Sequence, residues 1–301
     1  MTIDVWNNLL SSNLFLVSFT ILLTYGINFI LQKNYLLLDK IDCSSHKKFI
    51  TNTPVPLSLG LFFIITFLFF FTDINNNLNF YLLSLFFLGF FSDLFFLKKP
   101  IIKLIIQILV TIFFVQQNLF LISSLKNNIL FETLFNYYFF KLFFTIFCVC
   151  ILINGTNFCD GINTLSIGNY FLITMFLIST SLKYNLDISS FYLDRIILIL
   201  IIILIFNFLG KAFLGDSGSY MLGGYFAYVV ITFFEKNFFI SPVYVLLLVW
   251  YPCFEVLFSI IRKKIVKKNI SSPDNYHLHH LIFQQMKTIF KPEKKKLFFM
   301  Q

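Results

Sequence analysis

Residues 9–31 read LLSSNLFLVSFTILLTYGINFIL and contain no charged side chain. As an α-helix this stretch is long enough to cross the ~30 Å hydrocarbon core of a bilayer. It is too long for the apolar region of a signal peptide and no small-residue cleavage site follows it, so we expect a retained first span. Similar apolar runs follow at about residues 56–72, 79–97, 101–122, 137–153, 164–182, 190–208, 218–234 and 240–261. The sequence therefore predicts an all-α, polytopic transmembrane helix bundle of about nine spans, with no soluble domain.

The composition supports the same class. Of 301 residues, 58% are hydrophobic, 20% aromatic and only 12% charged, whereas soluble domains carry about 25% charged residues. So few charges exclude a soluble enzyme and a disordered chain. The five cysteines form no CxxC pair, and we expect them to be small core residues without a disulfide. We treat residues 1–301 as one integral membrane domain.

The distribution of basic residues predicts the orientation. If the 32–55 loop faces the cytoplasm, only five of the 23 Lys and Arg residues lie on the other side, and these are Lys126, Lys141, Lys183, Arg195 and Lys236. The positive-inside rule then places the N-terminus outside and the C-terminus in the cytoplasm. All four histidines fall on the cytoplasmic side, so we expect the chemistry on that face.

The net charge of +9 does not indicate nucleic acid, because the basic residues flank spans. The run from Arg262 to Lys268 directly follows the last span, as expected for anchoring against anionic lipid heads. The same basic run could also attract an anionic substrate to the membrane surface. Residues 281–301 hold five lysines and cannot cross a bilayer, so we expect a basic cytoplasmic tail that is at most an interfacial helix.

Two polar loops suit phosphate or metal chemistry. In the first, Asn154, Asn157, Asp160 and Asn163 recur at spacings of three, which places neighbouring polar groups on one side of a helical turn. Such a set could hold a hard cation or a sugar nucleotide, or be only a polar turn. The second, residues 215–219, is a Gly-Asp-x-Gly-Ser turn that leads into a helix. Its backbone amides suit phosphate and Asp216 suits Mg²⁺.

Three further segments carry polar residues near the same face. Residues 272–280 end in His277-Leu-His279-His280, which suit a pyrophosphate or a sugar, a zinc site or merely a polar loop. Residues 89–94 close the third run with Ser92 and Asp93, and Lys103 follows. His46 lies before the second run, whose Pro54 and Pro56 predict a helix start.

Taken together, these segments resemble the polyprenyl-phosphate N-acetylhexosamine-1-phosphate transferases, over about residues 33–283. The N-x-x-N-x-x-D-G-x-D/N-G-L loop of that family is similar to residues 154–165, with Thr164 where glycine is usual. Its G-D-x-G-S loop is similar to residues 215–219. Its S-P-x-x-D-R-x-H-L-H-H ending is similar to residues 272–280, with shorter spacing and Asn275 in place of arginine. The H-L-H-H form looks more like the N-acetylglucosamine branch.

The resemblance implies transfer of N-acetylhexosamine 1-phosphate from a UDP-sugar to undecaprenyl or another polyprenyl phosphate, with release of UMP. It implies Mg²⁺ or Mn²⁺ as cofactor and a place in the bacterial plasma membrane, at the start of a cell-envelope polysaccharide. A homodimer is left open. The resemblance assigns a catalytic role to Asp93, Lys103 and Asp216, and metal ligation to Asn157 and Asp216. It assigns substrate binding to the remaining polar residues, namely His46, Asn154, Asp160, Asn163, His277, His279 and His280.

Two departures from the family pattern leave alternatives open. The family usually has an Asp-Asp pair at the end of its third span, where this chain has Ser92 and Asp93. The family also has a further span after the histidine segment, whereas we expect that residues 281–301 do not cross the bilayer. A non-catalytic family member is therefore one alternative. A membrane transporter is another, although it would require ionisable groups near mid-bilayer, where only Glu255 is expected here.

Overall fold

The structure is a computed structural model, and it describes residues 13–38, 54–71, 76–117, 120–125, 132–186, 192–267, 278, 281–282 and 285. Within these ranges the secondary structure is helical, apart from one isolated antiparallel bridge between Leu38 and Pro56. The all-α class is therefore confirmed for the described part of the chain.

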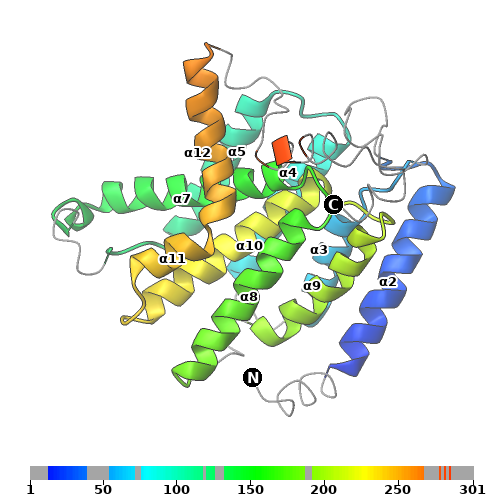
Figure 1. Cartoon of the computed structure of the whole chain (residues 1–301), viewed down its shortest axis with the longest axis horizontal. Helices are drawn as coiled ribbons and strands as arrows, with labels where there is room; N and C mark the ends of the chain where they lie inside the picture. The colour runs from blue at the N-terminus through cyan, green and yellow to red at the C-terminus, as the bar shows by residue number, and fades with distance from the viewer. Residues whose placement is uncertain are drawn as a thin grey trace. The chain divides into compact units, whose positions relative to one another are not determined.

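Each predicted apolar run coincides with a helix or, for the last run, with two (Figure 1). The helices are α2 (Leu14–Lys33), α3 (Leu59–Phe70), α4 (Asn76–Asp93), α5 (Pro100–Gln116), α7 (Tyr138–Cys159), α8 (Leu165–Lys183), α9 (Leu193–Phe208), α10 (Gly215–Lys236), α11 (Pro242–Leu248) and α12 (Trp250–Ile265). A 3₁₀ turn, η2 (Leu134–Asn136), precedes α7.

Fewer helices than nine meet the length and apolarity that a membrane crossing requires. Among the described residues three helices do so, namely α2, α7 and α8, and the bent pair α11–α12 would make a fourth. Helices α3 and α5 are apolar but shorter. The helices thus support a membrane protein, whereas the expected number of about nine spans is not confirmed.

The chain divides into two compact units, which we describe separately. The first holds residues 1–72, 160–215 and 279–301, and the second holds residues 73–159 and 216–278. The first unit thus contains α2, α3, α8 and α9, and the second contains α4, α5, α7, α10, α11 and α12.

In the first unit α9 supplies much of the core. Its long aliphatic run leaves most residues from Leu193 to Ile203 buried, and it packs against both α2 and α8. Helix α2 also packs against α3, and the buried Ser58 hydroxyl donates to the side-chain oxygen of Asn28. Helix α3 begins at Leu59, shortly after the two prolines, as the sequence predicts.

In the second unit α10 is the central helix, because it is buried on nearly every side. Helix α4 packs on α5, α5 packs on α7, and α7 packs extensively on α12. The contact between α7 and α12 depends on Gly155, where an added Cβ atom would lie 2.3 Å from the carbonyl oxygen of Pro252.

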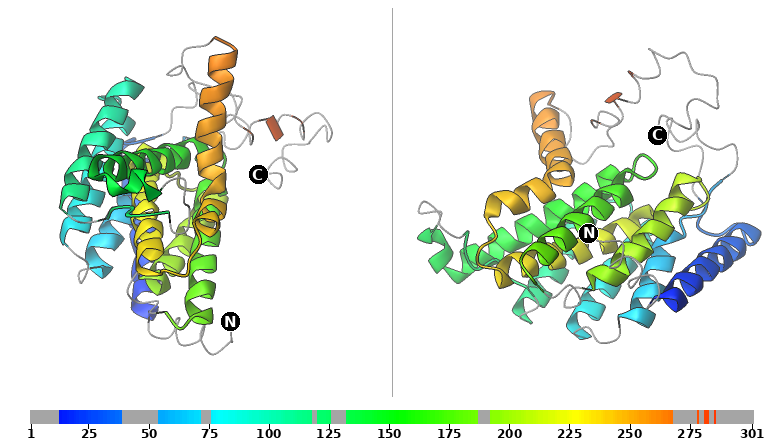
Figure 2. Two further views of the ribbon diagram at one scale, coloured as in Figure 1. Left: turned by 90° about the vertical axis from the view of Figure 1, so that its left-hand side faces the viewer. Right: turned by 60° about the horizontal axis from the view of Figure 1, so that its bottom comes forward.

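Helices α11 and α12 are bent by 77° relative to each other. The change of direction between them is visible in Figure 2. Pro252 explains the break, because its ring clashes with the carbonyl four residues earlier and it lacks an N–H. That carbonyl belongs to Leu248, the last residue of α11.

The outward side of α5 is apolar. Ile101, Ile105, Leu109 and Phe113 are each about half exposed or more on this helix. A soluble protein rarely exposes so large an apolar stripe. The stripe is what a helix that faces lipid requires.

Candidate functional site

Side chains from three helices converge on the carboxylate of Asp216, in the first turn of α10. Its Oδ2 atom accepts hydrogen bonds from Ser92 Oγ of α4 (2.5 Å) and from Lys103 Nζ of α5 (2.8 Å). Its Oδ1 atom accepts from Asn157 Nδ2 of α7 (2.7 Å). Four helices of the second unit therefore meet at one carboxylate.

Asp93, the last residue of α4, holds the start of the same helix α10. Its Oδ1 atom accepts from the backbone N–H of Asp216 (2.9 Å), and its Oδ2 atom accepts from that of Ser217 (3.0 Å). A carboxylate is favourable at a helix N-terminus because the free amides and the helix dipole are positive there. The Gly-Asp-x-Gly-Ser motif predicts that these amides bind phosphate, but in the structure two of them donate to Asp93.

Two glycines allow this geometry. Gly215 has a φ of 70°, a left-handed conformation that glycine adopts without penalty, and the chain turns there into α10. At Gly89 an added Cβ atom would lie 2.4 Å from the backbone of Asp216 and Ser217. The backbones of α4 and α10 thus touch directly, four residues before Asp93.

The neighbours of Asp216 stabilise its ionised form. Burial by itself would raise the pKa of Asp216, but the Lys103 ammonium and the hydrogen bonds from Lys103, Ser92 and Asn157 outweigh it. The pKa of Asp216 therefore lies below its usual range, and the carboxylate stays ionised at neutral pH. The side chains of Lys103 and Asp216 remain 19% and 26% exposed, so a ligand can reach the ion pair.

Gln107 is a polar residue of this region that sequence analysis missed. It is fully buried on α5, and its Oε1 atom accepts from Asn154 Nδ2 of α7 (2.7 Å). Asn154 also donates to the carbonyl of Cys150 (2.8 Å). The Nε2 atom of Gln107 is buried without a hydrogen-bond partner, which costs about 1–3 kcal/mol unless a ligand or water supplies an acceptor.

A signal for Gln107 exists in the sequence. Lys103, Gln107 and Thr111 follow one another at spacings of four on a helix whose other residues up to Val115 are apolar. Residues four apart share a helix face, so this stripe predicts a polar side of α5 that faces protein.

The structure thus brings together five of the predicted site residues. Hydrogen bonds link Asp216 to Asp93, Lys103 and Asn157. Asn154 lies on the same helix as Asn157 and bonds to Gln107. The predicted spacing of Asn154 and Asn157 on one side of a helical turn is also found, because α7 continues to Cys159.

Asp160 and Asn163 belong to the first unit, where they lie in the turn between α7 and α8. Asp160 is half-buried, and Asn163 is buried with no hydrogen-bond partner for its Nδ2 atom. Thr164 follows with a φ of 67°, and its backbone N–H donates to Asn207 Oδ1 (2.6 Å). This left-handed conformation explains why glycine suits the position better than threonine.

Four predicted substrate-binding residues lie outside the described residues, namely His46, His277, His279 and His280. The same holds for most of the predicted basic tail. Of the cysteines, Cys148, Cys150, Cys159 and Cys253 are described, and none of these four is in a disulfide.

The side chains around Asp216 suit Mg²⁺, which needs only one or two protein ligands, better than a metal ion whose ligands all come from the protein. Within the described ranges, no group of three or more His, Cys, Asp or Glu side chains is placed to hold a metal ion. Mg²⁺ commonly takes one or two carboxylates and completes its shell with water and substrate phosphates. Asp216 offers such a carboxylate, and the neighbouring Asn157 carries an amide oxygen.

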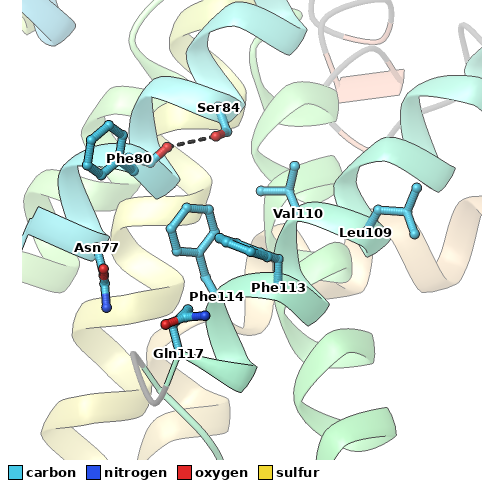
Figure 3. A pocket seen from close by; sticks show the side chains of 8 residues that line it. All are labelled: Asn77, Phe80, Ser84, Leu109, Val110, Phe113, Phe114 and Gln117. Atoms are coloured by element: carbon cyan, nitrogen blue, oxygen red, sulfur yellow. Dashed lines mark hydrogen bonds between the residues drawn. The ribbon is translucent and has the colours of Figure 1, made fainter.

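A separate hollow lies on the second unit between α4 and α5 (Figure 3). Its volume is about 620 Å³, and its lining is formed by Asn77, Phe80, Ser84, Leu109, Val110, Phe113, Phe114 and Gln117. None of these residues is acidic, basic or nucleophilic apart from one serine, whose Oγ donates to the Phe80 carbonyl (2.7 Å). The hollow therefore does not compete with the Asp216 cluster as a site of chemistry.

Comparison with known proteins adds a family match. Residues 77–234 match the family described as glycosyl transferase family 4. An undecaprenyl-phosphate alpha-N-acetylglucosaminyl 1-phosphate transferase of Thermotoga maritima is 30% identical over 238 residues, which cover 77% of this chain and 69% of that protein.

Two further relatives match over shorter stretches. A probable undecaprenyl-phosphate N-acetylglucosaminyl 1-phosphate transferase of Bacillus subtilis is 28% identical over 45% of this chain and 38% of its own length. An enzyme of Escherichia coli K12 with the same name as the Thermotoga protein is 32% identical over 48% of this chain and 41% of its own length. The family match spans α4 to α10 and so includes every member of the Asp216 cluster.

Proposed function

Because the chain belongs to glycosyl transferase family 4, we propose that it transfers an N-acetylhexosamine 1-phosphate from a UDP-sugar to a polyprenyl phosphate and releases UMP. The single observation that carries this proposal is the Asp216 carboxylate, to which Ser92, Lys103 and Asn157 all donate. The relatives, whose names specify an undecaprenyl-phosphate acceptor, support the same reaction.

The reaction joins two anions, so its main requirements are positioning and neutralisation of charge. In phosphoryl transfer the protein does little covalent chemistry, and it mostly aligns the reactants and stabilises the developing charge. The Lys103 ammonium lies at the site and is partly exposed, and we assign it to the phosphate of the lipid acceptor. The unpaired amide nitrogen of Gln107 supplies a further donor for an acceptor atom of the substrate.

We assign Mg²⁺ or Mn²⁺ to Asp216 and Asn157. When bound there, the cation would neutralise pyrophosphate oxygens of the UDP-sugar. Asp216 is suited to this task because its pKa is lowered and its carboxylate is ionised at neutral pH.

We infer that Asp93 acts by fixing the position of Asp216. Both of its carboxylate oxygens accept from backbone amides at the start of α10. A base is hardly needed for the acceptor, because the second pKa of a phosphate monoester is near 6 and little proton removal remains at pH 7. The lipid phosphate then attacks the β-phosphorus directly, and the bond to the UMP leaving group breaks.

Ser92 has no part in a covalent intermediate under this proposal. Its hydroxyl donates to the Asp216 carboxylate, and because the pKa of Asp216 is lowered, that carboxylate is too weak a base to activate a serine nucleophile. A serine at position 92, where the family pattern has an aspartate, is therefore compatible with direct attack by the lipid phosphate in a single displacement.

The remaining predicted residues are assigned to the nucleotide and the sugar. Asn163 has a buried, unpaired amide nitrogen that suits a ligand acceptor, and Asp160 and Asn154 would shape the adjoining nucleotide loop. We assign His277, His279 and His280 to the pyrophosphate, and His46 to substrate binding. We place the reaction on the cytoplasmic face of a bacterial plasma membrane, at the start of an envelope polysaccharide.

The proposal is tested by identifying the nucleotide product. Protein in lipid nanodiscs is supplied with undecaprenyl phosphate, Mg²⁺ and in turn UDP-N-acetylglucosamine, UDP-N-acetylgalactosamine or UDP-glucose. We expect UMP release and a lipid-linked sugar phosphate from an N-acetylhexosamine donor, and no product in the presence of EDTA. Release of UDP would refute sugar-phosphate transfer, because it indicates transfer of the sugar alone. Absence of product from every donor would favour a non-catalytic family member.

A further inference from the structure

Asn207 is a buried polar residue of the first unit that the proposed mechanism does not use. It lies in the last turn of α9, where the preceding residues from Ile196 to Phe206 are all apolar. Its side chain is only 2% exposed. A buried amide is costly unless its oxygen and its nitrogen both find partners. The two partners of Asn207 therefore indicate why the residue is there.

The partners come from two different turns of the first unit. The Oδ1 atom of Asn207 accepts from the backbone N–H of Thr164, in the turn between α7 and α8 (2.6 Å). Its Nδ2 atom donates to the carbonyl of Ala212, in the segment between α9 and α10 (3.0 Å). Both amide atoms are thus engaged within the protein, and these two bonds fix the orientation of the amide.

The end of α9 gives Asn207 a firm base. The backbone N–H of Gly210 donates to the carbonyl of Asn207 (3.0 Å), and Gly210 has a φ of 64°, as in the motif that ends many helices. Further on, the N–H of Phe213 donates to the carbonyl of Pro56 (3.0 Å), close to the start of α3. Asn207 is therefore held by its own helix and segment, and Thr164 is the group that it restrains.

Thr164 needs such a restraint. Its φ of 67° is left-handed, which is unfavourable for a residue with a branched side chain and persists only where the surroundings enforce it. Its N–H is bound by Asn207, and its Oγ1 atom donates to the carbonyl of Asn163 (2.6 Å). Both ends of the peptide group between residues 163 and 164 are thus held in place.

The side chain that this peptide group positions is that of Asn163. It is 8% exposed, and its Nδ2 atom has no hydrogen-bond partner among the described residues. A buried donor without a partner indicates that a ligand or a water molecule supplies the acceptor. The direction in which this donor points depends on the backbone that Asn207 holds.

We propose that Asn207 is a positioning residue for the nucleotide of the UDP-sugar. It keeps Thr164 left-handed and thereby holds the Asn163 amide ready to donate to an acceptor atom of the nucleotide. The inference rests on the proposed function for the identity of the ligand, but the contact to Thr164 and nucleotide binding can both be tested without turnover. Asn207 acts through the turn and is not a catalytic residue.

Three variants separate the bond to Thr164 from the bulk of the side chain. Asn207→Leu removes both hydrogen bonds at similar volume, whereas Asn207→Asp keeps an acceptor for the Thr164 amide. Combining Asn207→Leu with Thr164→Gly also removes the penalty of the left-handed conformation. Asn237→Leu is the matched control, because Asn237 is a buried asparagine whose Nδ2 donates to the Phe233 carbonyl, four residues earlier (2.8 Å). All variants are compared with the full-length wild type in nanodiscs.

The first measurement is hydrogen–deuterium exchange at the Thr164 amide, resolved by mass spectrometry with electron-transfer fragmentation. We expect exchange to accelerate about tenfold or more in Asn207→Leu, as for loss of a buried hydrogen bond, and to stay near the wild-type rate in Asn207→Asp and Asn237→Leu. Equal acceleration in Asn207→Asp would overturn the proposal. So would a wild-type amide that exchanges as fast as an unstructured peptide, a result that requires no variant to fold.

The second measurement is the binding of UMP, followed by isothermal titration calorimetry. UMP carries the nucleotide without the sugar or the lipid. We expect its Kd to rise about tenfold in Asn207→Leu, to recover largely when Thr164→Gly is added, and to be unchanged in Asn237→Leu. A wild type that does not bind UMP would overturn the proposal, as would a folded double variant in which the affinity does not recover.

Turnover separates this inference from the proposed function. We expect Asn207→Leu to raise KM for the UDP-sugar about tenfold, with kcat and the KM for polyprenyl phosphate nearly unchanged, as for loss of ground-state binding. A loss of kcat at unchanged KM would overturn the positioning role. If the wild type binds UMP and the variants respond as expected, but no UMP is released from any UDP-sugar, the proposed transfer fails and the role of Asn207 in nucleotide binding stands.

Discussion

Replacing Gly89 by alanine tests whether the contact between α4 and α10 builds the site. The Cβ atom that Gly89→Ala adds would lie 2.4 Å from the Asp216 carbonyl oxygen and from the Ser217 Cα and N atoms. Ordinary contacts are about 3.5–4.0 Å, so the backbone of α10 must retreat by roughly 1 Å. These neighbours are backbone atoms, which cannot move aside by a simple rotation of a side chain.

Such a displacement lengthens the hydrogen bonds that Asp93 accepts from the backbone of α10. They are 2.9 and 3.0 Å long in the structure, and a shift of roughly 1 Å takes them beyond hydrogen-bond range. Misplacing a catalytic group by that distance can lower the rate by about 10²-fold. Overpacking of this kind costs about 1–3 kcal/mol in the free energy of unfolding.

The assay measures both quantities on the same preparations. Turnover is followed as UMP release per folded protein, and folding is followed by the melting temperature in detergent. Gly26→Ala is the control, because an added Cβ atom there has no neighbour within 4 Å and should be neutral or slightly stabilising. Normal turnover of folded Gly89→Ala would refute the claim that close contact of these backbones positions Asp216.

Four further outcomes follow from the structure. We expect Asp216→Asn to lower turnover by at least about 10²-fold at saturating Mg²⁺, and near-normal rates would remove Asp216 from the metal site. Ser92→Ala should retain activity within about tenfold, because Asp216 keeps the Lys103 ammonium and Ser92 is not a general base. Asp93→Asn should lose at least about 10²-fold, since it replaces one of the two accepting oxygens by an NH2 group, which faces a backbone N–H and cannot accept from it. An inactive Ser92→Ala beside an active Asp93→Asn would contradict direct attack by the lipid phosphate. Thr164→Gly should raise the free energy of unfolding by about 1 kcal/mol by relieving the left-handed backbone, and an unchanged melting temperature would show that the conformation carries no strain.

Hydrophobic runs were sufficient to place the helices. Every predicted run contains a helix, because uninterrupted apolar residues over so many positions have few other stable arrangements in a membrane. The end of α7 was less predictable, because the segment after Asn154 is polar and glycine-containing and reads as a loop. Packing against α12 extends the helix to Cys159 instead.

The composition of the candidate site was predictable only in part. The motifs indicated Asp93, Lys103, Asn157 and Asp216, and the structure places them together. The partner of each group was not predictable, because Asp93 and the amides of α10 are more than a hundred residues apart in the chain. A helix N-terminus suggests an anion, but only the fold reveals that the anion here belongs to the protein itself.

The close helix contacts also have a genetic consequence. At Gly89, Gly155 and Gly223 an added methyl group would lie within 3 Å of an atom of a neighbouring helix. None of the three glycines has a side chain that can bind a substrate. Loss-of-function missense alleles should therefore collect at these glycines as well as at charged residues. A mutational scan for activity would then identify these glycines as essential, although their role is only to allow close contact between helices.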